Sequence, residues 1–292
     1  MTVLITGANG QLGQCLKTIE KKFLNLSCFF LDSSALDITN LEDCYKVFNE
    51  NKPNFVINTA AYTAVDLAEN EIQKANLVNH IGAENLAKVC KIHNSTLIHI
   101  STDYVFDGQK EMAYTECDTT NPISIYGKTK LAGEQAIINY WHKHLIIRTS
   151  WLYSDVGKNF YLSMLNLAKT KKELNIVNDQ IGSPTNAYEL ANSLLKIISF
   201  LSKKTAFNDY GIYHFTQKNS CSWYDFAKEI FYLNQIDIQV NPIPTSAYPT
   251  PAKRPAFSLL DTSKIEEIFD LNILTWQDAL KNNILNLSLM HI

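Results

Sequence analysis

Residues 2–13 read TVLITGANGQLG, and this stretch decides the fold expected for the chain. It begins with a β-rich apolar run and continues with Gly7, Gly10 and Gly13, before an amphipathic stretch that starts at Gln11. Glycine permits a tight turn and lets the N–H groups at a helix N-terminus approach a pyrophosphate. A strand, a glycine turn and a helix in this order predict a dinucleotide site, although a glycine-rich turn without a ligand is the plainer alternative.

The second expected strand, residues 27–31, ends at Asp32. An acidic side chain at this position accepts hydrogen bonds from the adenosine ribose hydroxyls. Two serines follow, and no Arg or Lys occurs before Lys46, so charge favours NADH over NADPH. Serine hydroxyls can also hold a 2′-phosphate, and the choice between NADH and NADPH stays open. Asp37 and Ile38 belong to a short segment that could flank the adenine.

Two further apolar runs, residues 55–57 and 97–100, predict parallel strands. In an open parallel sheet, ligands bind beyond the carboxyl ends of the strands. The residues after the first of these runs should therefore line the cofactor crevice: Ala61, Tyr62 and Thr63. STDYVF follows the second run, so we expect Thr102 and Asp103 to lie at the same edge of the sheet as the glycine turn.

The segment YGKTKLAGE places Tyr126 and Lys130 four residues apart, on one face of a helix that we expect to start at Pro122. A nearby ammonium favours the phenolate, so we expect Lys130 to lower the pKa of Tyr126 and fit it for proton transfer. The same two residues could equally be a core aromatic and a solvated charge. Gly127 and Gly133 lie in this helix, where close approach of another backbone or of a ligand would explain them.

The composition limits which classes of protein the chain can belong to. The chain has 292 residues, 46% of them hydrophobic and 19% charged, and a net charge of −3, which gives no reason to expect a nucleic-acid surface. No apolar run approaches the roughly 20 residues that span a bilayer, and the N-terminal strand lacks a basic leader, so we expect a cytoplasmic protein without a membrane partner. Six scattered cysteines predict free thiols and no metal site.

The alternation of strands and helices becomes less regular after residue 150. We therefore expect an NAD(P)-binding Rossmann domain over residues 1–150 and mainly a substrate domain over residues 151–292, with about 186–215 returning to the Rossmann core. Trp151 follows a strand and could pack on a sugar ring, or be a core tryptophan. Residues 241–255 hold five of the eight prolines and Arg254, a candidate phosphate contact that could equally be a surface arginine.

Several motifs together carry a resemblance that covers nearly the whole chain. They are TGANGQLG, NTAAYTAVDLAE, STDYVF, YGKTKLAGE, RTSWLY, DQIGSPT and RPAFSLLD. The chain resembles the extended short-chain dehydrogenase/reductase family, and within it the dTDP-4-dehydrorhamnose reductases. The resemblance implies an α/β fold, a Rossmann-like doubly wound parallel sheet with a smaller mixed α/β substrate domain. It also implies reduction of the C4 keto group of dTDP-4-dehydro-β-L-rhamnose by NADPH or NADH, in the synthesis of surface-polysaccharide precursors.

The resemblance also implies roles for residues of this sequence. Tyr126 would protonate the C4 alkoxide, Lys130 would tune Tyr126 and hold the nicotinamide ribose, and Thr102 would bond the reacting oxygen. Asp103 and Trp151 would contact the sugar of the dTDP-sugar substrate. The residues that would line the cofactor are Gly10, Gln11, Leu12, Asp32, Asp37, Ile38, Ala61, Tyr62 and Thr63.

Some family members bind Mg²⁺ between subunits through acidic side chains, one of them early in the first helix. That region reads Gln14, Cys15 and Leu16 in this chain, so neither the metal nor that mode of pairing is expected, and a homodimer stays open.

Four other functions compete with this reductase. A sugar-nucleotide 4,6-dehydratase needs a second acid after the Asp of STD, and this chain has Tyr104 there. Another nucleotide-sugar 4-ketoreductase or a 4-epimerase needs only the tyrosine and lysine pair, and STDYVF and RPAFSLLD disfavour the epimerase. A non-catalytic subunit, like the regulatory subunit of methionine adenosyltransferase, resembles the same family.

Overall fold

The computed structural model describes residues 1–290 and places six parallel strands in one sheet, in the order β10-β5-β4-β3-β1-β2. Every pair of neighbours in this sheet is parallel. The predicted Rossmann-like α/β fold is therefore confirmed. The strands are β1 (Thr2–Thr6), β2 (Ser27–Leu31), β3 (Phe55–Asn58), β4 (Thr96–Thr102), β5 (His144–Thr149) and β10 (Gly211–His214).

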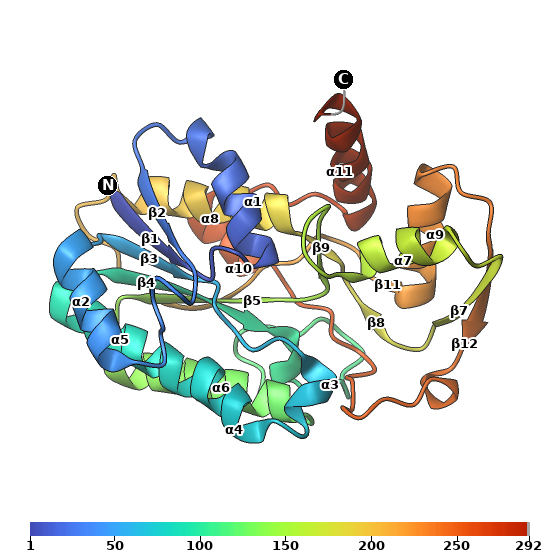
Figure 1. The fold of residues 1–292 in the computed structure, drawn as a ribbon, viewed down its shortest axis with the longest axis horizontal. Coiled ribbons are helices and arrows are strands. Elements are labelled where there is room, and N and C mark those ends of the chain that lie inside the picture. The colour runs from blue at the N-terminus through green and yellow to red at the C-terminus, as the bar shows by residue number, and fades with distance from the viewer. Residues whose placement is uncertain (291–292) are drawn as a thin grey trace.

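Helices cover both faces of the sheet (Figure 1). Because side chains alternate along a strand, Val3 and Ile5 belong to one hydrophobic cluster and Leu4 to another. The first cluster contains side chains of α1 (Gln11–Ile19), α8 (Ala187–Leu201) and α10 (Ser263–Phe269). The second contains side chains of α2 (Leu41–Asn51), α5 (Gly82–His93) and α6 (Ile125–Tyr140). The short elements η1 (Glu20–Lys22), α3 (Val65–Ala68) and α4 (Ile72–Asn76) connect these parts.

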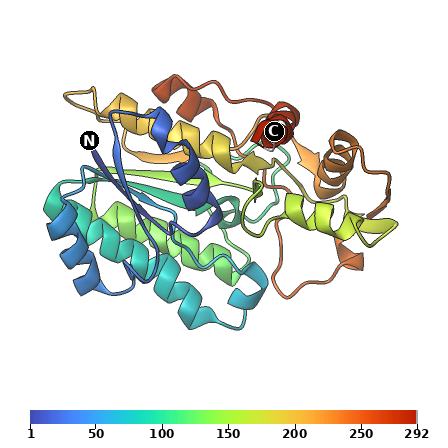
Figure 2. The ribbon, with the colours of Figure 1, turned by 45° about the horizontal axis from the view of Figure 1, so that its top comes forward.

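A smaller body lies beside the carboxyl ends of the sheet strands, at the right of Figures 1 and 2. Its own hydrophobic cluster is centred on Tyr153, Phe226 and Trp276. Its elements are β6 (Leu152–Tyr153), α7 (Phe160–Ala168), β7 (Glu173–Val177), β8 (Ile181–Gly182), β9 (Thr185–Asn186), β11 (Cys221–Ser222), α9 (Trp223–Leu233), β12 (Gln239–Ile243), η4 (Thr245–Ala247) and α11 (Trp276–Met290). Within residues 1–290 no helix has the length and apolar character needed to cross a membrane.

Two expected helix starts were wrong by one or more residues. The helix expected from Pro122 begins at Ile125, because the Ser124 side chain caps it by accepting a hydrogen bond from Gly127 N. Thr185 stands directly before the stretch 186–201, so the sequence predicts it as the cap of a helix there. The cap is instead Asn186, whose side chain accepts from Tyr188 and Glu189 N. In both cases a better placed polar side chain nearby satisfies the free N–H groups.

Candidate active site

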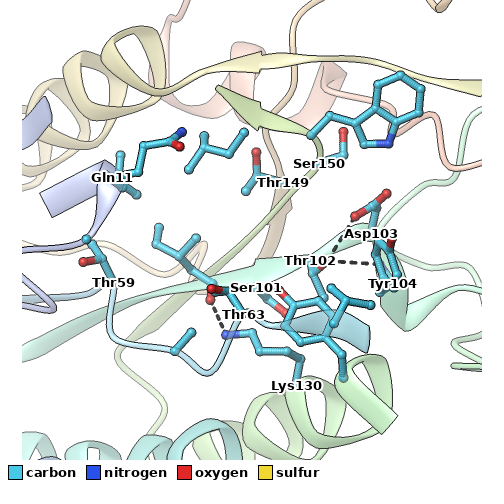
Figure 3. Close-up of a pocket in the computed structure, with 18 of the residues that line it drawn as sticks. Gln11, Thr59, Thr63, Ser101, Thr102, Asp103, Tyr104, Lys130, Thr149 and Ser150 are labelled. Atoms are coloured by element: carbon cyan, nitrogen blue, oxygen red, sulfur yellow. Dashed lines mark hydrogen bonds between the residues drawn. The ribbon is translucent and has the colours of Figure 1, made fainter. Parts of the chain in front are cut away.

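A cavity of about 540 Å³ lies at the carboxyl ends of the central strands (Figure 3). Five segments far apart in sequence contribute to its walls: the glycine turn, the end of β3, the end of β4, the face of α6 and the end of β5. The residues predicted for the site that line this cavity are Gly10, Gln11, Leu12, Ala61, Thr63, Thr102, Asp103, Tyr126, Lys130 and Trp151. The other predicted residues lie outside its lining: Gly7, Gly13, Asp32, Asp37, Ile38, Tyr62 and Arg254.

The glycine turn fits a pyrophosphate. Gly7 has φ +68°, and a Cβ there would meet Ala60 N at 2.7 Å, so only glycine suits the position. A Cβ on Gly13 would meet Gly7 O at 2.5 Å, which lets α1 pack directly on the turn. Gly10 is the N-cap of α1 and provides no side-chain cap, so the first N–H groups of the helix can serve an anion at the cavity wall.

Asp32 closes a turn at the end of β2 and also binds the glycine turn. Its Oδ1 accepts from Ser34 Oγ at 2.6 Å, and its Oδ2 accepts from Asn9 Nδ2 at 2.7 Å. The hydrogen bonds from Ser34 hold the pKa of Asp32 below its ordinary value. Asp37 binds Thr39 in a similar way, through Oδ1. These carboxylates therefore shape the backbone near the cavity.

The loop after β3 is held by the amide of Asn79, which lies in the π-helical turn η2 (Leu77–Ile81). Asn79 Oδ1 accepts from Tyr62 N at 2.8 Å, and its Nδ2 donates to Tyr62 O and to Thr129 Oγ1, both at 3.1 Å. The Tyr62 hydroxyl donates to Glu71. Asn79 thus joins the loop to α6, and a Cβ on Gly133 would meet its carbonyl oxygen at 2.2 Å. Backbone approach explains this helix glycine.

Tyr126 and Thr102 both line the cavity, and Thr102 Oγ1 lies 3.0 Å from Asp103 Oδ1 (Figure 3 shows this hydrogen bond). Burial raises the pKa of the Tyr126 phenol to about 12, the bond with Thr102 lowers it, and the charge of Asp103 raises it further. The expected lowering of this pKa by Lys130 was therefore wrong, because burial dominates. Burial also raises the pKa of Asp103 to about 6, against hydrogen bonds from Ser258 and Thr102.

Lys130 lies on the same face of α6 as Tyr126, with its Nζ turned toward β4. It donates to Ile100 O at 2.6 Å and lies 3.2 Å from His99 Nε2. Burial lowers the pKa of Lys130 to about 8, and the charge of Glu134 acts in the opposite direction. His99 was not predicted as a site residue, since nothing in the local sequence distinguishes it from a core histidine.

Trp151 stacks on Trp223, with ring centroids 3.6 Å apart. A Cβ on Gly182 would meet the Trp151 ring at 2.8 Å, so glycine makes room for this stack. Beyond the two rings lies a second cavity of about 490 Å³, and Arg254 lines this cavity. The Arg254 guanidinium is paired with Asp66 through Nη2 at 2.8 Å and Nη1 at 3.1 Å.

A loop of the second half of the chain closes over the glycine turn. Asn159 Nδ2 donates to Gln11 Oε1 at 3.1 Å, across 148 residues of sequence, and a Cβ on Gly157 would meet Gln11 Cβ at 3.2 Å. Tyr104 packs edge-on against the ring of Tyr126. These contacts could not be predicted from the sequence, because neither periodicity nor a motif indicates a contact between residues so far apart in the chain. The cavity residues that it did not name are Asn9, Thr59, Val65, Ile100, Ser101, Tyr104, Thr149, Ser150, Leu152, Gly157 and Lys158.

Comparison with known proteins places this site in a family. The family model described as the RmlD substrate binding domain matches residues 1–289. The dTDP-4-dehydrorhamnose reductase of Aggregatibacter actinomycetemcomitans is 44% identical over 287 residues, which cover 96% of this chain and 97% of the relative. The chain belongs to the dTDP-4-dehydrorhamnose reductase family.

Solved structures of dTDP-4-dehydrorhamnose reductases agree with this assignment. The enzyme from Clostridium acetobutylicum has a TM-score of 0.92 and 44% identity, with 100% of both chains covered. The enzyme from Bacillus anthracis, solved in complex with NADP, has a TM-score of 0.92 and 38% identity and covers 98% of this chain and 99% of its own. The resemblance to dTDP-4-dehydrorhamnose reductases that the motifs predicted is thereby confirmed.

Proposed function

We propose that this protein is an NAD(P)H-dependent oxidoreductase that reduces the C4 keto group of dTDP-4-dehydro-β-L-rhamnose to give dTDP-L-rhamnose. The observation that carries the proposal is the Tyr126–Thr102 pair, which faces the same cavity as the glycine turn. The candidate proton donor and the glycine turn expected to bind the dinucleotide both line one cavity of about 540 Å³, which supports the proposal. The choice of substrate rests on the relatives, which are named dTDP-4-dehydrorhamnose reductases.

The cofactor would lie along the glycine turn. Its pyrophosphate would receive the N–H groups at the start of α1, and the wall beside it would be formed by Gly10, Gln11, Leu12, Ala61 and Thr63. When bound there, NADPH or NADH supplies the hydride that reduces C4. The NADP complex of the Bacillus anthracis relative favours NADPH. The other residues predicted for the cofactor site would hold this wall in position without lining the cavity: Gly7, Gly13, Asp32, Asp37, Ile38 and Tyr62.

Tyr126 would donate the proton to the C4 oxygen. Its raised pKa keeps the phenol protonated at neutral pH, so the proton is available when negative charge develops on that oxygen. Thr102 would orient the phenol and bond the same oxygen. The ammonium of Lys130 would stabilise the resulting tyrosinate, since it lies one helical turn away, and hold the nicotinamide ribose.

The sugar nucleotide would enter from the side of the smaller body. Asp103 and Trp151 would contact the sugar, because both line the cavity near Tyr126. The second cavity, beyond the Trp151–Trp223 stack, has apolar walls that suit a nucleoside. Arg254 would bind the diphosphate by exchanging its Asp66 carboxylate for phosphate oxygens. In this proposal residues 1–150 bind mainly the cofactor and the later part of the chain binds mainly the substrate.

The test is oxidation of NADPH and NADH by the purified protein with dTDP-4-dehydrorhamnose, followed by identification of the product. We expect oxidation that depends on this sugar and dTDP-L-rhamnose as the product. Tyr126→Phe should reduce kcat at least about a hundredfold, the contribution of a positioned general acid. Tyr140→Phe is the matched control, because Tyr140 is 39% exposed at the far end of the same helix. Cofactor binding without sugar-dependent oxidation would refute the reductase and favour a non-catalytic subunit.

A further inference from the structure

Residues 154–159 form a tight loop, which belongs to the second half of the chain. The side chain of Asn159 closes this loop. Its Nδ2 donates to Ser154 O at 2.9 Å and to Val156 O at 3.1 Å. Its Oδ1 accepts from Leu162 N at 3.0 Å and so caps α7. One amide therefore fixes both the shape of the loop and its attachment to the following helix.

The same amide fixes the loop to the start of α1. Asn159 Nδ2 also donates to Gln11 Oε1 at 3.1 Å. Gly157 has φ +77°, and a Cβ there would meet Gln11 Cβ at 3.2 Å, so the loop approaches α1 closely at a glycine. Gln11 lies at the end of the cavity away from Asp103 and Tyr104 (Figure 3). The loop therefore stands at the glycine-turn end of the cavity.

Lys158 lies between these two contacts with Gln11, and it lines the cavity. Two lining residues are cationic, Lys130 and Lys158, and the Lys130 ammonium already donates to Ile100 O at 2.6 Å. Lys158 is exposed and forms no ion pair with any side chain that the structure describes. Its ammonium is therefore available to an anion at this end of the cavity.

The Gln11 amide adds a second free donor at the same place. Asn159 Nδ2 is an N–H donor, so the group of Gln11 that faces it is the acceptor Oε1. The other end of the amide, Nε2, is buried and has no hydrogen-bond partner among the described residues. A buried donor without a partner is costly, and a ligand with acceptor oxygens would satisfy it. An ammonium and an amide N–H together suit phosphate oxygens.

We propose that Lys158 binds the pyrophosphate of the nicotinamide dinucleotide, and that Asn159 positions Lys158 by holding the loop 154–159 against Gln11. The first N–H groups of α1, which also suit that pyrophosphate, lie at the same wall. This role rests on the proposed function. It makes the second half of the chain part of the cofactor site.

Two other phosphate groups compete for Lys158. The 2′-phosphate of NADPH belongs beside the adenosine ribose, near Asp32 at the end of β2, whereas the loop contacts the first residue of α1. The diphosphate of the sugar nucleotide is assigned to Arg254, which lines the second cavity. The position of the loop therefore favours the pyrophosphate, which NADPH and NADH have in common.

The first experiment measures the dissociation constants of NADPH and NADH for the full-length protein by calorimetry. Lys158→Met should raise both constants by about three- to tenfold, and Lys158→Arg should restore most of the affinity. The effect of Lys158→Met should shrink at high salt, because the lost interaction is between exposed charges. Lys169→Met is the control, because Lys169 lies at the far end of α7 and bonds Asn166 outside this cavity.

Three results would overturn the proposal. The first is an unchanged dissociation constant for both dinucleotides in Lys158→Met. The second is a loss of affinity for NADPH alone, which would assign Lys158 to the 2′-phosphate. The third is a higher KM for the dTDP-sugar with unchanged cofactor binding, which would assign it to the sugar nucleotide. If the original protein bound neither dinucleotide, the proposed function itself would fail, and this result is distinct from the other three.

The second experiment tests the positioning role with Asn159→Ser. Serine still offers an N-cap to α7, but it lacks the Nδ2 group that holds the loop against Gln11. We expect weaker binding of both dinucleotides and a smaller effect of Lys158→Met in this variant, because its ammonium is no longer held in place. Fully additive effects would overturn the positioning role. If Asn159→Ser does not fold, the Lys158 variants still decide whether Lys158 binds the pyrophosphate.

Discussion

Two arginine–carboxylate pairs of similar geometry lie in different surroundings. Arg148 and Glu134 are 2.6 Å apart, with side chains 2% and 1% exposed. Arg254 and Asp66 are 2.8 Å apart, with side chains 23% and 39% exposed. Similar distances therefore do not imply similar contributions to stability, because the free energy lost on breaking an ion pair depends on whether water can solvate the separated charges.

The buried pair holds the helix that carries Tyr126 and Lys130. Arg148 of β5 donates to Glu134 of α6 through Nε and Nη2, and Ser101 of β4 also donates to Glu134. Glu134 therefore joins β4 and β5 to α6. An unpaired charge at this place would have no water to replace its partner.

The half-exposed pair joins the two parts of the chain across the substrate side. Asp66 is in α3, after β3, and it accepts from Arg254 and from Ala252 N in the proline-rich loop. Water can replace either partner, so the pair contributes little stability and can exchange with a ligand phosphate.

The largest expected effect follows from breaking the buried pair. Glu134→Ala leaves Arg148 buried without its carboxylate, which should lower the free energy of unfolding by about 3–5 kcal/mol. Urea denaturation measures this loss. A loss below about 1 kcal/mol would show that Arg148 finds water or another partner, and the contrast with the exposed pair would disappear.

A second variant distinguishes loss of charge pairing from loss of packing. Glu134→Leu combined with Arg148→Met replaces both charges by apolar groups of similar volume, so no unpaired charge remains. We expect this protein to be within about 2 kcal/mol of the original in urea denaturation, and more stable than Glu134→Ala. If the double variant were as unstable as the single one, the hydrogen bonds of Glu134 would matter more than charge compensation.

The exposed pair should affect binding more than stability. Asp66→Asn removes the charge that competes for Arg254, so KM for the dTDP-sugar should fall several-fold, while the free energy of unfolding changes by less than about 1 kcal/mol. Arg254→Met should raise KM instead. Glu84→Gln is the control, because it weakens another exposed ion pair, with Lys88, remote from the cavity. Equal KM values in all three variants would exclude phosphate exchange at Arg254.

The smallest expected effect is the pH dependence of the exposed pair. The hydrogen bond from Arg254 holds the pKa of Asp66 below its ordinary value. A lowered carboxyl pKa contributes stability above the unfolded-state value of about 4, and this contribution is lost as pH falls through the lower folded-state value. The difference in unfolding free energy between the original protein and Asp66→Asn should therefore be small at neutral pH and shrink in acid. A difference that grows in acid contradicts the assignment.

The sequence allowed much of the fold to be predicted because the signals are local. A strand, the turn with Gly7 and Gly10 and the following helix are neighbours in the chain. Asn40 likewise stands directly before the stretch that ends at about Asn51, which predicts an N-cap from the residue type alone, and it caps α2. The helix starts at Ser124 and Asn186 were missed, since several polar residues lie close together there and only hydrogen-bond geometry selects one.

By itself the sequence determined that Tyr126 and Lys130 share one helix face and that glycines replace side chains where backbones approach. Tertiary structure alone decided in which direction the pKa values of these two residues are shifted. Burial raises the pKa of Tyr126, and the partners of Lys130 include His99, 31 residues away, which is in turn bonded to Asn58, a further 41 residues away. The physical reason is that a pKa depends on desolvation and on distances through space, which spacing along the chain does not specify.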